Sequence, residues 1–203
     1  DKDKYQYVLH LADDLLILSH RNSEWCGHGP VLEQDIAITN ITLDLIGQAR
    51  NLYQYAASMA DGDATEDTVA YLRREHEYLN SLLTEQPKGD WAVTTLRQFM
   101  YSTYQFLLFD KLQYCDDAQL AAIAAKALKE ITYHVRWSSE WVIRLGDGTE
   151  DSHNRMLQAI DRLWMYTGEL FLPASYEKAA LVNGFGADLS AIRIDWVQKV
   201  HDV

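Results

Sequence analysis

Four residues in two helical stretches have the types and the spacing of metal ligands. Glu130 and His134 are four residues apart in KALKEITYHVRWSSEW, and Asp44 and Gln48 have the same spacing in ITLDLIGQARN. Side chains four apart lie on one face of a helix. Two such pairs that face each other across a helix bundle are how carboxylate-bridged di-iron sites are built. The chemistry to consider first is therefore oxygen activation at a pair of iron ions.

The match to such a site is incomplete. In ferritin-like di-iron proteins the pairs are Glu-x-x-His, with a spacing of three rather than four. Gln48 also stands where a histidine is needed, and its amide oxygen is a poor substitute for an imidazole nitrogen as an iron ligand. Buried polar groups that do not bind metal must bond with one another. The pattern thus favours a degenerate site over a working one.

The two remaining helices of a di-iron bundle should each supply a carboxylate. The first helical stretch offers Asp13 or Asp14, and since adjacent residues do not share a helix face, we expect at most one to point inward. Between Asp90 and Asp110 the sequence has no Asp or Glu. The polar candidates in that stretch are Tyr101, Tyr104 and Gln105.

We therefore predict a buried polar network at the degenerate metal-site positions, with no metal and no catalytic residue. Its members are Asp13, Asp44, Gln48, Glu130 and His134, joined by a tyrosine. Two alternatives stay open. Glu130 and His134 could be an ordinary hydrogen-bonded pair, or the chain could be a di-iron or di-manganese oxidoreductase in its own right, which the empty fourth helix argues against.

The segment SEWCGHGP also brings chemically active residue types together. Cys26 and His28 could start a zinc site, but no second pair of thiols or imidazoles lies nearby in the sequence. A cysteine nucleophile needs a base in hydrogen-bond geometry, which two neighbouring loop residues rarely reach unaided. A tight loop anchored by Trp25 is the favoured interpretation.

Hydrophobic periodicity predicts an all-α protein. Apolar residues recur at spacings of three and four, and the few prolines and glycines fall between the periodic stretches. The predicted helices span about 5–21, 31–59, 65–85, 91–114, 118–145, a sixth stretch that ends near 171, and 188–200. Helices one and two, then four and five, form hairpins, and residues 60–90 are long enough to cross the bundle. This predicts one ferritin-like domain over residues 1–203, a four-helix bundle with extra C-terminal helices, with a plain helical array as the alternative.

Composition excludes several classes of partner. The chain has 203 residues, of which 48% are hydrophobic, and its 30 acidic and 18 basic side chains give a formal charge of −12. Such a surface repels phosphate backbones and anionic lipids, so we expect no nucleic-acid or membrane partner. Two cysteines do not make a disulfide framework, which favours a reducing cytoplasm. Six tryptophans and twelve tyrosines are many for this length; aromatic residues on helix faces usually belong to the core, and an excess of them also suits a large subunit interface.

Long ungapped motifs carry a resemblance to a known family. The motifs are SEWCGHGP, DLIGQAR, LLTEQPKGD and AAKALKEITYH. In these and in the stretches between them the chain resembles the PaaC-type structural subunits of phenylacetyl-CoA epoxidases. The similarity covers most of the chain up to about residue 175 and weakens beyond it. Members of that family usually continue past the point where this chain stops, so a C-terminal truncation is left open.

The resemblance implies a place in aerobic bacterial phenylacetate degradation. The multicomponent mono-oxygenase converts the aromatic ring of phenylacetyl-CoA to a 1,2-epoxide, with oxygen and reducing equivalents from NADPH. The di-iron site lies in a separate catalytic subunit, and a reductase with flavin and an iron–sulfur cluster delivers electrons. The PaaC-type subunit has no cofactor or catalytic residues of its own and pairs with the catalytic subunit, and with further subunits of the complex. A homodimer of the isolated chain is compatible with this role, and a homodimeric helical scaffold unrelated to oxygen chemistry is the remaining alternative.

Overall fold

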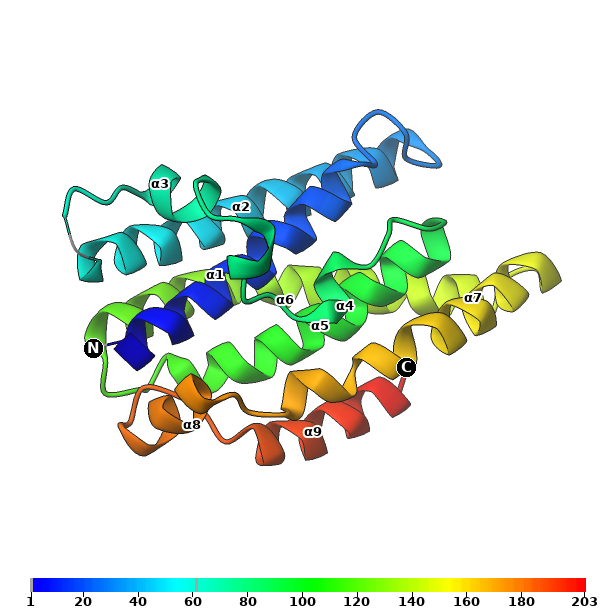
Figure 1. Ribbon diagram of the computed structural model, residues 1–203. Helices are drawn as coiled ribbons and strands as arrows, with labels where there is room; N and C mark the ends of the chain where they lie inside the picture. The colour runs from blue at the N-terminus through cyan, green and yellow to red at the C-terminus, as the bar shows by residue number, and fades with distance from the viewer. Residues whose placement is uncertain (1, 61) are drawn as a thin grey trace.

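Four long helices form the bundle of this protein. The computed structural model describes residues 2–60 and 62–203, and all regular elements among them are helical. The bundle helices are α1 (Lys2–Ser23), α2 (Leu32–Met59), α5 (Trp91–Leu112) and α6 (Ala118–Gly146). The α1–α2 hairpin packs on the α5–α6 hairpin through α2 and α6, and the connection between the hairpins crosses the bundle (Figure 1). The ferritin-like, all-α arrangement predicted from the sequence is confirmed.

The other helices cover two sides of the bundle. They are α3 (Glu66–Tyr71), the 3₁₀ turn η1 (Glu75–Glu77), α4 (Leu82–Glu85), α7 (Glu150–Leu163), the 3₁₀ turns η2 (Trp164–Tyr166) and η3 (Gly168–Phe171), α8 (Ser175–Val182) and α9 (Leu189–His201). Helices α7 and α9 pack against α5, and α8 packs against α1 (Figure 1). Helix α5 is therefore enclosed, and from Trp91 to Gln105 all its residues are buried. This agrees with its sequence, which is apolar on nearly every side.

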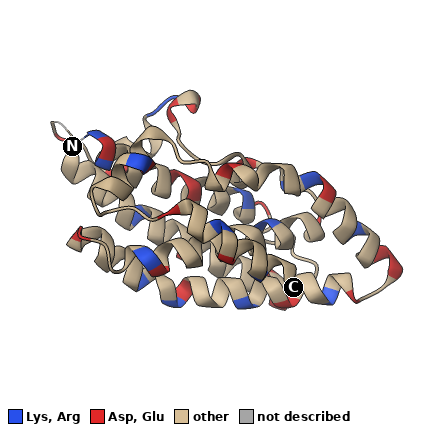
Figure 2. Ribbon diagram, turned by 90° about the horizontal axis from the view of Figure 1, so that it is seen from below, with Lys and Arg blue, Asp and Glu red and all other residues tan. Residues whose placement is uncertain are grey.

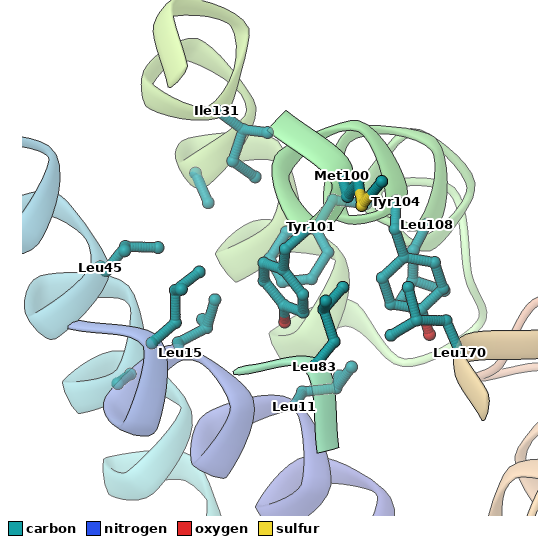
Figure 3. Close-up of a cluster of buried hydrophobic side chains, with 14 of the residues drawn as sticks. Leu11, Leu15, Leu45, Leu83, Met100, Tyr101, Tyr104, Leu108, Ile131 and Leu170 are labelled. Atoms are coloured by element: carbon teal, nitrogen blue, oxygen red, sulfur yellow. The ribbon is translucent and has the colours of Figure 1, made fainter. Parts of the chain in front are cut away.

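The centre of the bundle is built from large aliphatic and aromatic side chains. Leu15, Leu45 and Ile131, from three different bundle helices, are completely buried, and Met100 of the fourth is 1% exposed. Figure 3 shows Leu15 and Leu45 on the side of α5 that carries Tyr101, and Met100 on the side of α5 that carries Tyr104 and faces Leu170. Each fully buried side chain of this size contributes about 1.5–3 kcal/mol relative to an exposed one. Apolar burial across this centre therefore holds the two hairpins together.

The charged residues lie mainly on the outer faces of the helices. Figure 2 shows acidic and basic positions distributed along the outside of the bundle, including the turn that precedes α7. In the described part of the chain, no helix combines the length and the apolar character needed to traverse a bilayer. The apolar stripes of the long helices instead face the protein interior.

The crossing segment differs from the single helix predicted over residues 65–85. Thr65 caps α3 in a capping box with Thr68, but the helix stops at Tyr71. Beyond it, backbone N–H groups bond to carboxylates of α1: Leu79 to Asp13 at 2.7 Å and Ser81 to Asp14 at 2.6 Å. An N–H used in this way is not available to a helix. These bonds to α1 override the helical propensity of the segment.

The same contacts correct the expectation that at most one of Asp13 and Asp14 points inward. Both are buried, with exposures of 0% and 1%. The crossing segment covers a second side of α1, so two adjacent side chains can both be enclosed. Asp13 pairs with both terminal nitrogens of Arg73 and accepts a hydrogen bond from the Tyr53 hydroxyl at 2.6 Å. Asp14 accepts from the Ser81 hydroxyl at 2.9 Å.

His10 ties α1 to both the crossing segment and α8. Its Nδ1 donates to the Leu79 carbonyl at 2.7 Å, and its Nε2 lies 3.5 Å from the Glu177 carboxylate. Burial by itself lowers the pKa of His10, but Asp14, Glu177 and the Leu79 carbonyl together outweigh it. The pKa of His10 is therefore raised above its ordinary value of 6.5.

This raised pKa predicts a pH-dependent stability. The folded protein holds the His10 proton more tightly than the unfolded chain, so the stabilisation is complete below pH 6.5 and is lost as pH rises through the folded-state pKa. His10→Asn keeps a donor for the Leu79 carbonyl but does not titrate. Urea unfolding between about pH 6 and pH 9 should show a decline in the wild type that is smaller in the variant. Equal declines in the two proteins would contradict the assignment to His10.

Candidate functional site

Two polar pairs occupy the seam between α2 and α6. The Gln48 Nε2 donates to a Glu130 carboxylate oxygen at 2.7 Å, and the Gln105 Nε2 donates to the Gln48 Oε1 at 2.8 Å. A carboxylate only accepts hydrogen bonds, so Glu130 fixes the orientation of the Gln48 amide, and Gln48 in turn fixes that of Gln105. Three helices are thus linked by one directed chain of hydrogen bonds, from α5 through α2 to α6.

His134 and Asp44 form the second pair. The His134 Nε2 lies 3.0 Å from an Asp44 carboxylate oxygen, and this nitrogen carries the proton because the carboxylate accepts. The His134 side chain is completely buried, whereas that of Asp44 is 34% exposed. The other ring nitrogen, Nδ1, is buried with no hydrogen-bond partner among the described residues. The buried imidazole of His134 is thus bonded only on the side of Asp44, which is the side nearer to solvent.

These residues do not form a ligand set for two iron ions. Such a set needs carboxylates from all four helices and two imidazoles. Here α2 contributes the Asp44 carboxylate but the Gln48 amide in place of an imidazole, and α5 contributes the Gln105 amide in place of a carboxylate. The amide nitrogen of Gln48 faces the one carboxylate that it contacts. In the described chain, no three His, Cys, Asp or Glu side chains come close enough together to hold a metal ion. The side chains instead bond with one another, while the Gln105 Oε1 and the His134 Nδ1 are buried without a hydrogen-bond partner among the described residues.

The residues that were predicted to form one polar network lie in two separate places. Gln48 contacts Glu130, and His134 contacts Asp44, across the seam as their spacing suggested. Asp13 lies instead in the separate cluster with Arg73, because the crossing segment reaches α1 from the outside. The prediction that Asp13 belongs to the polar network at the seam is therefore wrong.

The residue that α5 contributes to the seam is Gln105 rather than a tyrosine. A sequence signal for it existed. Gln98, Ser102 and Gln105 are spaced by four and three on an otherwise apolar helix, and all are buried. Gln98 accepts a hydrogen bond from Asn22 of α1 at 2.7 Å, and the Ser102 hydroxyl lies 3.4 Å from that of Ser138 in α6. A polar stripe on an enclosed helix indicates partners on the helices around it.

The loop SEWCGHGP is anchored by its tryptophan, as predicted. The Trp25 Nε1 donates to the Thr94 hydroxyl at 2.7 Å, and its ring packs edge-on against Trp91 with centroids 4.9 Å apart. The Asp35 carboxylate accepts from the backbone N–H groups of Gly27 and Gly29, which lowers the pKa of Asp35. Gly27 has a φ of +78°, a conformation that favours glycine. These contacts give the loop a structural role.

Comparison with known proteins agrees with the resemblance seen in the motifs. A family model described as phenylacetic acid catabolic protein matches residues 1–203. The C subunit of the 1,2-phenylacetyl-CoA epoxidase of Escherichia coli (strain K12) is 47% identical over 194 residues. That alignment covers 96% of this chain and 78% of the Escherichia coli protein.

Proposed function

We propose that this chain, which belongs to the family of phenylacetic acid catabolic proteins, is the structural subunit of a phenylacetyl-CoA 1,2-epoxidase. In this role it performs no chemistry itself. It binds and supports a separate catalytic subunit with a di-iron site. A reductase with flavin and an iron–sulfur cluster supplies that subunit with electrons from NADPH.

The observation that carries this proposal is the chain of hydrogen bonds from Gln105 through Gln48 to Glu130. It lies where a ferritin-like oxygenase concentrates its iron ligands, but amides replace ligands on two of the helices. Both polar ends of the Gln48 amide and the nitrogen of the Gln105 amide are engaged in these hydrogen bonds. A metal ion could enter only by breaking these bonds, which would leave buried polar groups unpaired.

The name of the Escherichia coli relative supports the complex but not the division of labour within it. One lettered subunit of an epoxidase implies others, and 47% identity over 96% of this chain places the two proteins close together. The absence of chemistry in this subunit is our inference from the side chains at the seam. We place the assembly in the cytoplasm, because both cysteines, Cys26 and Cys115, are free thiols, as in a reducing compartment.

The test combines metal content with activity. We expect the chain purified alone, after growth with added iron, to contain almost no iron and to leave phenylacetyl-CoA unchanged when a reductase and NADPH are supplied. Adding the catalytic subunit should produce the ring epoxide. About two irons per chain, as a di-iron site requires, would identify the chain as an oxidoreductase in its own right.

A second experiment tests whether this chain stabilises the catalytic subunit. The catalytic subunit should be less stable, or less active at low protein concentration, without this chain than with it, since binding stabilises the folded partner. Thermal unfolding of the catalytic subunit with and without the chain measures the effect. If the chain changes neither stability nor turnover and only self-associates, it is a homodimeric scaffold and the proposed role is wrong.

A further inference from the structure

The outward stripe of α2 has almost no charge. Six exposed residues follow one another at spacings of three and four along this side of the helix. They are Ile36, Asn40, Leu43, Gly47, Arg50 and Gln54, and are called the α2 outer stripe below. Two are large aliphatic side chains, with Leu43 61% and Ile36 51% exposed. The only charge in the stripe, Arg50, is paired with Glu66 at 2.6 Å.

Helix α6, the neighbour of α2 in the seam, has an ordinary solvent face by comparison. Its exposed residues include five charged side chains, Lys126, Lys129, Arg136, Glu140 and Arg144. In a chain with a net charge of −12, a long exposed stripe whose one charge is already paired is unusual. Loss of charged residues from the centre of a patch distinguishes protein interfaces from the remaining surface.

The surface between the two helices is hollowed where a partner could approach closely. A groove of about 260 Å³ runs between them, lined by residues that include Leu43, Gly47, Lys126 and Glu130. A Cβ atom added at Gly47 would meet nothing within 4 Å. The packing of this chain therefore does not require a glycine at position 47. A glycine inside a helix also lowers the stability of that helix. An approaching side chain or helix could use the space that it leaves.

The size of this face matches a stable interface. Helix α2 has 28 residues and is therefore about 42 Å long. Two helices packed about 9 Å apart present a strip about 20 Å wide, which gives about 800 Å². That is the area which each partner contributes to a standard protein–protein interface.

The charges beside the stripe indicate the chemistry of the partner. Of the five charged residues exposed on α6, four are basic and one is acidic, in contrast to the acidic chain as a whole. Lys126 lines the groove itself, together with the carboxylates of Asp44 and Glu130, which are engaged by His134 and Gln48 of this chain. A partner that fits has an apolar helical face with acidic side chains along one edge, since complementary charges favour encounter and register.

We propose that the α2 outer stripe and the basic edge of α6 are the surface to which the catalytic subunit of the epoxidase binds. This inference rests on the proposed function, which supplies the occupant. Leu43 and Ile36 form the apolar centre, Gly47 admits the partner helix, and Lys126 and Lys129 meet its acidic edge.

The experiment measures binding of the purified catalytic subunit to variants of this chain. Leu43→Glu places a charge at the apolar centre and should weaken binding at least about tenfold. Ile194→Glu makes the same change at a 73% exposed position on α9 and should leave the affinity unchanged. Lys126→Glu with Lys129→Glu should slow association and reduce its dependence on salt.

A second variant separates binding from folding. Gly47→Gln adds a side chain where this chain has open space and replaces glycine by a better helix former, so the thermal unfolding temperature should rise. The same side chain should obstruct the partner and weaken binding at least about tenfold. Greater stability with weaker binding is a result that general damage to the fold does not produce.

The outcomes distinguish this surface from the proposed function. If the wild-type chain binds the catalytic subunit and both Leu43→Glu and Gly47→Gln bind as tightly, the surface is assigned wrongly while the function stands. If the wild type does not bind at all, the proposed function fails first. If the variants lose only self-association, the stripe joins two copies of this chain, and the inference is overturned.

Discussion

Replacing Asp13 by alanine should lower the free energy of unfolding by about 3–5 kcal/mol. The carboxylate is completely buried and pairs with both terminal nitrogens of Arg73, whose side chain is 13% exposed. It also accepts from the Tyr53 hydroxyl and the Leu79 backbone. The substitution removes the only anion that Arg73 contacts among the described residues, so this cation keeps only neutral partners such as the Val69 and Glu77 carbonyls. It also removes the acceptor of the Tyr53 hydroxyl and of the Leu79 N–H, and losing these partners in a poorly hydrated site costs more than the intact pair contributes.

Urea unfolding followed by circular dichroism measures this loss. Asp161→Ala is a suitable control, because Asp161 is exposed on α7 and should change stability by less than about 0.5 kcal/mol. A second variant tests the cause. If the unpaired Arg73 is responsible, adding Arg73→Met to Asp13→Ala should recover part of the lost stability. A double variant as unstable as the sum of its parts would show that the two residues act independently.

The second large effect is expected at Trp196. Its side chain is 1% exposed, and its Nε1 donates to the Met100 carbonyl of α5 at 2.9 Å. Its ring packs against Phe171 and Trp164, with centroids 5.3 Å and 5.9 Å away. Trp196→Ala removes the largest buried side chain of α9 and should cost about 3–5 kcal/mol.

Further variants and hydrogen exchange test separately how large the loss of stability is and which helices it affects. Trp196→Phe keeps most of the ring and loses the hydrogen bond, so its cost should be clearly smaller than that of the alanine variant. Ile194→Ala, at an exposed position two residues away, should be nearly neutral. Hydrogen exchange should show faster opening of α9 and η3 in Trp196→Ala, with α1 and α2 unaffected. Uniform acceleration across all helices would contradict a local role.

The bundle could be predicted from the sequence because its helices are long and strongly periodic. The predicted ends of α2 at residues 31 and 59 differ from the observed Leu32 and Met59 by one residue at most. The crossing segment could not be predicted in the same way. Its conformation depends on carboxylates of α1 more than 60 residues earlier, and local propensity contains no information about them.

The polar residues at the seam could also be predicted only in part from the sequence. The spacing of Asp44 with Gln48 and of Glu130 with His134 correctly indicated two pairs of side chains that face each other. Pairing across the seam, however, depends on the relative rotation and height of α2 and α6. That rotation also decides that Gln105 reaches Gln48 whereas Tyr101 and Tyr104 do not, and periodicity within one helix does not specify it.

The directed order of the hydrogen bonds at the seam has an evolutionary consequence. Gln48→His alone would deprive both Glu130 and Gln105 of their partner, and Gln105→Glu alone would set one acceptor against the Gln48 Oε1. Each single step toward a metal-binding arrangement therefore adds buried, unpaired groups to the Gln105 Oε1 and the His134 Nδ1, which already have no hydrogen-bond partner among the described residues. Only several simultaneous substitutions avoid that loss. The hydrogen bonds from Gln105 through Gln48 to Glu130 therefore oppose the gain of metal ligands at the seam by one substitution at a time.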